Sequence, residues 1–124
     1  VGSTALPVVH IEPLAGFYDY GSKYTAGRTE YHCPAALGSE VTARVQAAAL
    51  AAHRSLGCEV YSRVDVLLDA EERPWVLEVN TIPGMTQTSL LPKAARAAGL
   101  DFGALCERII ELSMDVPGRK RVNP

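Results

Sequence analysis

Side chains of the types that bind metal ions and phosphate occur at four positions: Arg63, Asp65, Glu78 and Asn80. Carboxylate and amide oxygens are hard ligands that suit Mg²⁺ or Mn²⁺, and Mg²⁺ usually completes its coordination with water and substrate phosphates. A guanidinium beside such ligands offers a fork of N–H donors to a phosphate group. Two neighbouring carboxylates repel each other unless a cation lies between them or one is protonated. These residue types predict a site for a metal ion and phosphate, if the fold brings them together.

A β-hairpin is the element that would bring them together. Residues 59–68 and 75–79 are typical of strands, and the polar segment 69–74 is typical of the turn between them. Pairing the strands symmetrically about this turn places the two carboxylates directly opposite each other, and Arg63 opposite Asn80. A slip of one residue would bury the charges, so this register is favoured.

The other face of the hairpin is entirely apolar in this register. Its members are Val64, Val66, Leu68, Trp75, Leu77 and Val79. We expect these residues, apart from Leu68 and Trp75, to be buried beneath helices, because the face carries no polar side chain.

An amphipathic hairpin whose polar face is merely solvated would show the same spacing. Two features favour a binding site over this alternative. Leu67 and Val76 are predicted to share the polar face, which is more typical of a lined cleft than of open surface. The loop 81–86 (TIPGMT) can also present backbone N–H groups to an anion. From spacing alone, both interpretations stay open.

Apolar residues at helical spacing predict three helices around the hairpin. They span residues 39–56, 89–98 and 102–114, and short strands are expected at 6–11 and 30–33, separated by a loop over 12–28. Ser39 and Asp101 are expected N-caps, and Gly57 is expected to end the first helix. The core stripe of that helix is predicted to be Val41, Val45, Ala48, Ala49, Ala52 and Leu56. The fold class is therefore α+β, with an antiparallel sheet packed against the first and last helices.

Composition narrows the class of protein. The chain has 124 residues, 48% of them hydrophobic, and a formal net charge of −2, which disfavours a nucleic-acid partner. It holds no apolar run long enough to span a membrane, so no membrane partner is expected. Three cysteines without metal-type spacing indicate reduced thiols and a cytoplasmic location. His10, His32 and His53 have no partner at ligand spacing and are expected to be structural or surface residues.

Three segments together resemble a known family. The segments YDYGSKYTAG, SRVDVLLD and LEVNTIPGMTQTSLLPKAARAAGL are similar, in this order, to the C-terminal region of the D-alanine–D-alanine ligase family of ATP-grasp enzymes. The resemblance covers nearly the whole chain. It implies that residues 1–114 form a C-terminal ATP-grasp domain and that 115–124 are a disordered tail. It also implies that the chain is a fragment without the N-terminal domain and most of the central domain.

The resemblance assigns roles to the hairpin residues. Asp65, Glu78 and Asn80 match the ligands of two Mg²⁺ (or Mn²⁺) ions, with Glu78 bridging them. Arg63 matches the arginine that contacts the transferred phosphate and the tetrahedral intermediate. Gly84 matches the glycine whose backbone N–H contributes to the oxyanion hole.

It also assigns residues to the amino-acid substrate. Ser89 and Leu90 match positions at a helix start that hold the carboxylate of the second D-alanine. Lys23 and Tyr24 match a loop pair that closes over the substrates, and Lys23 also matches a contact to substrate.

The implied reaction joins two D-alanines for peptidoglycan synthesis. ATP phosphorylates one carboxylate, and the amine of the second D-alanine attacks the acyl phosphate. The implied partners are ATP and D-alanine, the whole protein is expected to be a homodimer, and the fragment alone is expected to be inactive. A ligase of the D-alanine–D-lactate type, another ATP-grasp enzyme, and a non-catalytic nucleotide- or metal-binding module remain the alternatives.

Overall fold

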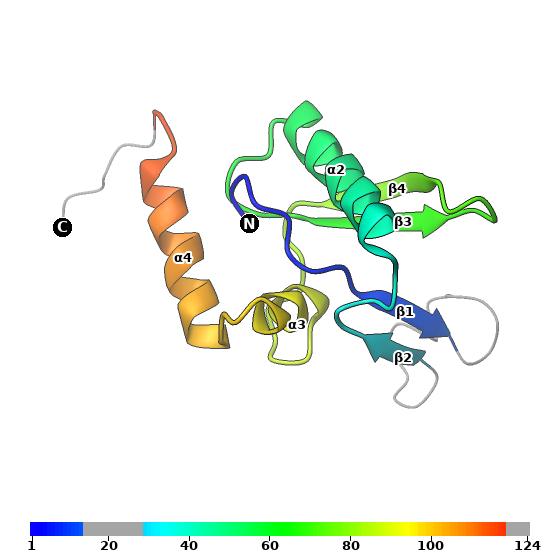
Figure 1. Cartoon of the computed structure of the whole chain (residues 1–124). Coiled ribbons are helices and arrows are strands. Elements are labelled where there is room, and N and C mark those ends of the chain that lie inside the picture. Colours follow the sequence, from blue (N-terminus) through cyan, green and yellow to red (C-terminus); the bar gives the residue numbers. More distant parts are fainter. Residues whose placement is uncertain (14–28, 119–124) are drawn as a thin grey trace.

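Two small antiparallel sheets and three helices make up the part of the chain that the structure, a computed structural model, describes: residues 1–13 and 29–118 (Figure 1). In chain order the elements are β1 (His10–Pro13), β2 (Thr29–His32), α2 (Ser39–Ser55), β3 (Arg63–Leu68), β4 (Pro74–Asn80), α3 (Leu90–Ala97) and α4 (Phe102–Asp115). Among these described residues, β1 pairs with β2 alone and β3 pairs with β4 alone. The α+β class is therefore confirmed, although the strands form two separate hairpins and not one sheet.

The hairpin β3–β4 has the predicted register at its open end. Asp65 lies opposite Glu78, and Arg63 lies opposite Asn80. Beyond Asp65 the pairing shifts by one residue, so that Val66 lies opposite Val76 and not opposite Leu77. Here the predicted register is wrong, because Leu77 forms a β-bulge.

The turn explains the bulge. Asp69 N–H donates to the carbonyl of Arg73 at 3.1 Å, so the turn is centred on Glu71 and not between Glu71 and Glu72. A turn centred half a residue earlier pairs the strands one residue out of step with the Asp65–Glu78 pair. One residue of β4 must then bulge to restore that pair.

Asp69 holds this turn in place. Its carboxylate accepts the backbone N–H groups of Glu71 and Arg73 at 3.0 and 2.9 Å, and the Trp75 indole N–H at 3.0 Å. Hydrogen bonds from Trp75 and Arg73 to the charged form hold the pKa of Asp69 well below its usual range.

The bulge also changes which side chains are exposed. Leu77 is 65% exposed, whereas burial was predicted, and Trp75 is 55% exposed. Val76 lies opposite Val66, so its predicted place on the polar face is wrong. Leu67 alternates with Asp65 along β3 and stays on that face, with Trp75 opposite it. Val64, Val66 and Val79 are half-buried.

Helix α2 covers the hairpin β3–β4 (Figure 1). Val41 and Val45 from the predicted stripe are buried, but Leu56 is 66% exposed because it lies beyond the helix as its C-cap. The N-cap is Gly38 and not Ser39, and the Gly38 carbonyl accepts the first helical hydrogen bond from Thr42 N–H. Gly57 ends the helix as predicted, with a φ of 68° that glycine adopts without strain.

Two predicted strands start later than expected. β3 begins at Arg63 and not at residue 59, because Val60 and Ser62 bond elsewhere: the Val60 carbonyl accepts Gly2 N–H, and the Ser62 hydroxyl bonds His53. β1 begins at His10 and not at residue 6, because the Val8 carbonyl accepts Ala35 N–H outside any strand pairing.

Helix α4 packs mainly on α3. The prediction that it packs against the sheet is therefore wrong. Leu91 and Ala95 of α3 and Leu105 of α4 form the centre of this core. Asp101 caps α4 as predicted, since its side chain accepts the N–H of Ala104 at 2.8 Å. α4 ends at Asp115, inside the predicted tail, and residues 119–124 lie outside the described part of the chain.

None of the helices within residues 1–13 and 29–118 is long and apolar enough to cross a membrane.

Replacing Leu105 with alanine should destabilise the fold. Leu105 has no exposed surface, so Leu105→Ala removes buried methyl groups and leaves a cavity between α3 and α4. We expect the free energy of unfolding to fall by about 3 kcal/mol in a urea titration. Ile110→Ala on the same helix removes a 59% exposed side chain and should cost less than about 1 kcal/mol. A loss of unfolding free energy in Leu105→Ala as small as that in Ile110→Ala would show that the α3–α4 contact contributes little.

Stability should fall on mild acidification because of His53. This side chain is 6% exposed, its Nδ1 lies 2.7 Å from Ser62 Oγ, and its Nε2 has no hydrogen-bond partner. Burial lowers the pKa of His53 below its ordinary value, so the unfolded chain binds this proton more tightly. The contribution of His53 to the free energy of unfolding therefore rises with pH up to about 6.5 and falls as the pH drops below that value. Thermal melts from pH 7.5 to 5 should show a steeper fall for the native chain than for His53→Gln; parallel curves would contradict this.

Candidate metal and phosphate site

The four predicted hairpin residues lie together at the open end of β3–β4. Arg63 is the first residue of β3, Asn80 is the last of β4, and Asp65 and Glu78 form the next cross-strand pair on the same face. Cross-strand pairing and the alternation of side chains therefore place a guanidinium, two carboxylates and an amide on one surface.

The Arg63 guanidinium lies between the two carboxylates. Its Nε donates to Asp65 Oδ1 at 2.8 Å and one terminal nitrogen donates to Asp65 Oδ2 at 3.1 Å, which makes a bidentate pair. The same nitrogen donates to Glu78 Oε1 at 3.4 Å. This guanidinium is the cation that the repulsion between the carboxylates requires, and the three side chains keep one net negative charge.

Exposure differs across this group. The side chains of Arg63 and Asp65 are 23% and 19% exposed, whereas that of Glu78 is 54% exposed. Arg63 and Asp65 also line a cavity of about 750 Å³ bounded by α2 and the N-terminal segment. Glu78 therefore presents its carboxylate outward, where an ion or phosphate can reach it.

Asn80 connects the hairpin to the loop that follows. Its Oδ1 accepts the backbone N–H of Ile82 at 3.1 Å, which orients the amide and starts the turn into residues 81–88. The carbonyl oxygen has a second lone pair, so this hydrogen bond leaves it able to bind a cation.

Gly84 packs directly against the start of α3. A Cβ atom built on Gly84 would lie 2.9 Å from Ser89 Oγ, so no larger residue fits without movement. Ser89 Oγ accepts the N–H of Thr86 at 3.1 Å and lies 2.7 Å from Thr86 Oγ1. The predicted oxyanion residue and the predicted carboxylate-binding residue are therefore neighbours in one hydrogen-bonded loop.

The remaining predicted residues divide into two groups. Leu90 is the first residue of α3 and Ser89 is its N-cap, so both lie at a helix start, although the helix begins one residue later than predicted. Lys23 and Tyr24 lie outside the described residues.

One cluster was missed by the sequence analysis. His10 and His32, interpreted there as isolated, lie directly opposite each other on β1 and β2, beside Glu12. The missed signal is the alternation His10-Ile-Glu12, which can pair with Glu30-Tyr-His32 across the loop.

Comparison with known families identifies a matching domain. A family model described as D-ala D-ala ligase C-terminus matches residues 2–111. A D-alanine--D-alanine ligase of Methylacidiphilum infernorum is 58% identical over 109 residues, which are 88% of this chain and 36% of that protein. One from Nitratidesulfovibrio vulgaris is 54% identical over 120 residues, or 96% of this chain and 40% of that protein. The chain thus spans well under half the length of these relatives.

Solved structures agree with the sequence match. The D-alanine--D-alanine ligase of Bacillus anthracis complexed with ATP superposes with a TM-score of 0.78 at 43% identity, covering 93% of this chain and 37% of that one. The VanG D-Ala:D-Ser ligase of Enterococcus faecalis gives a TM-score of 0.70 at 36% identity, covering 86% and 31%. With the family match over most of its length, this chain belongs to the D-alanine–D-alanine ligase C-terminal domain family, within the ATP-grasp enzymes.

Proposed function

We propose that this chain is the metal- and phosphate-binding part of an ATP-dependent ligase that joins two D-alanines for peptidoglycan synthesis. The observation that carries this proposal is the placement of Arg63 between Asp65 and Glu78, on a domain similar to ligases that include one solved with ATP. ATP and D-alanine are the proposed substrates, and the whole enzyme is proposed to be a cytoplasmic homodimer.

The donor set fits Mg²⁺ or Mn²⁺. Asp65, Glu78 and Asn80 offer only oxygen ligands, and the face they share has one net negative charge when Arg63 is counted. In the proposed enzyme these three side chains would hold two ions, with Glu78 shared between them. When bound, the ions would neutralise charge on the phosphates and polarise the transferred phosphoryl group.

Arg63 would bind the transferred phosphate. Its bidentate pairing with Asp65 fixes the plane of the guanidinium, so the group is held in a defined orientation. We infer that the contact to Glu78, the longest of the three at 3.4 Å, is the one that opens when metal and phosphate bind.

The loop after β4 would bind the reacting amino acids. The Gly84 N–H would donate to the oxyanion that forms when the amine attacks the acyl phosphate. Ser89 and Leu90, at the start of α3, would hold the carboxylate of the second D-alanine, since a helix N-terminus favours an anion. Lys23 and Tyr24 would close the site.

A complete ATP site needs more than this chain. The hairpin carries exposed apolar side chains at Leu67, Trp75, Val76 and Leu77. We propose that these residues contact a further domain that supplies the adenine pocket, and that the 124-residue chain alone has no ligase activity. The overall proposal is tested by ATP-dependent phosphate release from the complete polypeptide containing this chain, with D-alanine, D-serine and D-lactate compared as second substrates. We expect phosphate release to be greatest with D-alanine as the second substrate. Release only with D-lactate as the second substrate would favour the alternative ligase type.

Neutralising Glu78 should abolish most turnover. Glu78→Gln keeps the shape of the side chain but removes the charge that would bridge the two ions, so we expect kcat to fall at least about a hundredfold. The matched control is Glu107→Gln, an exposed position on α4, which should leave kcat unchanged. Circular dichroism would check that both variants fold. Activity of Glu78→Gln within about twofold of the native enzyme would remove this residue from the site.

Adding one methyl group at Gly84 should impair catalysis through Ser89. The new Cβ would lie 2.9 Å from Ser89 Oγ, so Gly84→Ala must displace this hydroxyl, which bonds Thr86. We expect kcat/KM for the second D-alanine to fall at least about tenfold, because small misplacements of binding groups cost this much or more. Gly38→Ala is the control, since nothing lies within 4 Å of its added Cβ. A Gly84→Ala enzyme with unchanged kinetics would show that this contact is not needed.

A further inference from the structure

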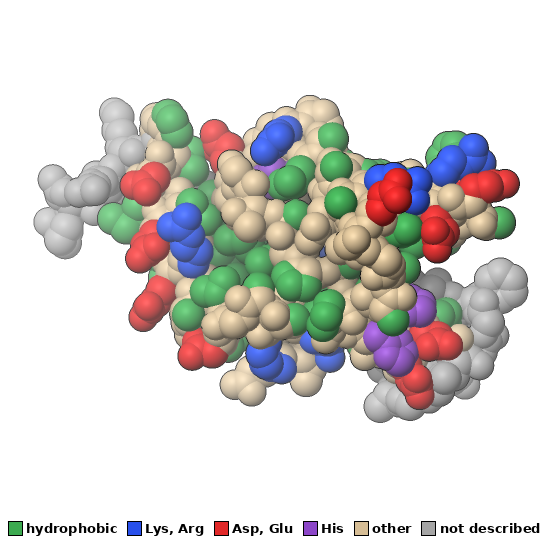
Figure 2. All heavy atoms as spheres, viewed as in Figure 1, with side chains coloured by type: hydrophobic (Ala, Val, Ile, Leu, Met, Phe, Trp, Pro, Cys, Tyr) green, Lys and Arg blue, Asp and Glu red, His purple; other side chains and the backbone are tan. Residues whose placement is uncertain are grey.

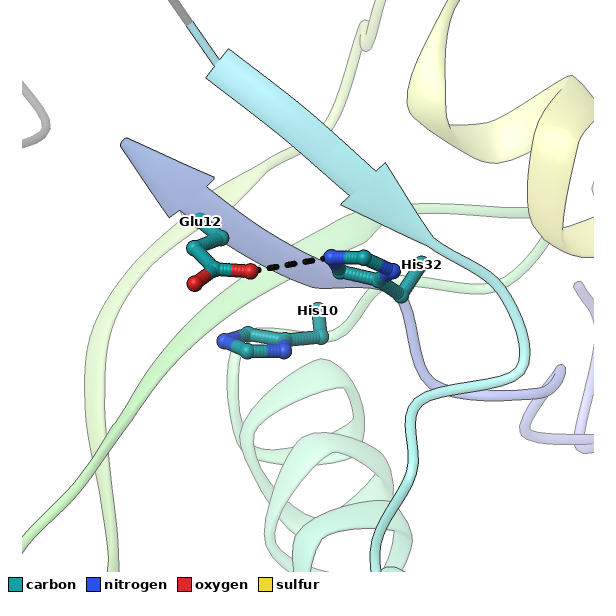
Figure 3. Close-up of side chains that lie close together, drawn as sticks. All are labelled: His10, Glu12 and His32. Carbon is teal, nitrogen blue, oxygen red and sulfur yellow. Dashed lines mark hydrogen bonds and ion pairs between the residues drawn. The ribbon is translucent and has the colours of Figure 1, made fainter. Parts of the chain in front are cut away.

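A second group of metal-ligating side chains lies on the small hairpin β1–β2. His10 lies opposite His32, and Glu12 lies opposite Glu30. Because side chains alternate along a strand, these four residues project from the same face of the ribbon. Figure 3 shows the His10 and His32 rings beside each other, with the Glu12 carboxylate directed at His32.

The distances suit one shared ion. One ligand atom each from His10, Glu12 and His32 lies within 4.8 Å of the other two. His32 Nε2 is 3.0 Å from Glu12 Oε2 and 3.7 Å from Glu30 Oε2. Ligand atoms around a tetrahedral Zn²⁺ ion lie about 3.3 Å apart, so binding would draw these exposed side chains closer together.

The environment also suits a cation. Histidine and acidic side chains gather on the surface beside β1 and β2 (Figure 2). Two carboxylates with two neutral imidazoles carry two negative charges, which match a divalent ion. The nearby cation Lys93 lies over the ring of Tyr31. Side chains alternate along β2, so Tyr31 projects from the face of the ribbon opposite to that of His32.

A surface ion pair between His32 and Glu12 would leave part of this arrangement unexplained. Such pairs between exposed side chains contribute little stability. The His32 and Glu12 side chains are 44% and 53% exposed, and an ion pair between them gives no role to His10, whose ring centroid lies 5.5 Å from that of His32. One shared ion uses all of these groups.

We propose that His10, Glu12 and His32, with Glu30 as a fourth ligand, form a binding site for a divalent transition metal ion of the Zn²⁺ type. Imidazole nitrogens favour Zn²⁺, Co²⁺, Ni²⁺ and Cu²⁺ over Mg²⁺, so this site differs in selectivity from the oxygen ligands on β3–β4. The ion would link β1 to β2, the two strands on either side of residues 14–28 in the sequence. The proposal does not depend on the ligase activity.

Calorimetric titration tests this site directly. The complete polypeptide, without an affinity tag and stripped with a chelator, is titrated with ZnCl₂ in buffer that contains excess MgCl₂ to occupy the oxygen sites. We expect one Zn²⁺ per chain, a Zn²⁺-dependent rise in melting temperature, and affinity reduced at least about tenfold in both His10→Gln and His32→Gln. Glu12→Gln should weaken binding as well, whereas the matched control Glu40→Gln on α2 should not.

Cobalt spectroscopy separates this site from the cysteines. Co²⁺ bound by imidazole and carboxylate should give visible absorption bands without the sulfur-to-metal charge-transfer band that Cys33, Cys58 or Cys106 would produce. If one histidine variant does not fold, the other and Glu12→Gln decide the question. Unchanged Zn²⁺ stoichiometry and affinity in the histidine variants, a sulfur band in the cobalt spectrum, or no binding at 0.1 mM Zn²⁺ in about 0.1 M salt would each overturn the proposal.

Discussion

Charge balance among Arg63, Asp65 and Glu78 is the constraint on which the rest of the hairpin depends. Two carboxylates directly opposite each other on paired strands destabilise that pair unless a positive charge compensates them. Arg63 provides this compensation with a bidentate contact to Asp65 and a longer contact to Glu78. In the proposed enzyme the two contacts would have different roles: Asp65 would hold the guanidinium, while the more exposed Glu78 would exchange it for a metal ion.

The bulge at Leu77 follows from a conflict between this pair and the turn. Asp69 ties the turn together with hydrogen bonds to Arg73 and Trp75, and this geometry sets a register one residue different from that of Asp65 and Glu78. Both sets of interactions persist because β4 accommodates one extra residue. As a consequence, Leu77 is exposed, and the hairpin presents an apolar surface beside its polar site.

The two hairpins separate two kinds of ligand chemistry. β3 and β4 carry oxygen ligands with an arginine, which suits a hard ion that shares phosphate. β1 and β2 carry imidazoles with carboxylates, which suits a softer ion. Both sets arise in the same way. Alternation places residues two apart in a strand on one face, and antiparallel pairing adds two residues of the partner strand to the same face.

Local signals in the sequence were enough to predict the α+β class, the end of α2 at Gly57, the cap of α4 at Asp101 and the pairing of Asp65 with Glu78. Each depends on residues near one another in the chain, or on a hairpin whose turn is short. Tertiary structure alone decided the bulge, the packing of α4 on α3 and the meeting of His10 with His32. The hydrogen bonds of Asp69 select between turns that differ by one residue, and hydrophobic periodicity does not distinguish them. Helix amphipathicity likewise shows that a face is buried but not against which partner, and pairing across a long loop leaves no local pattern.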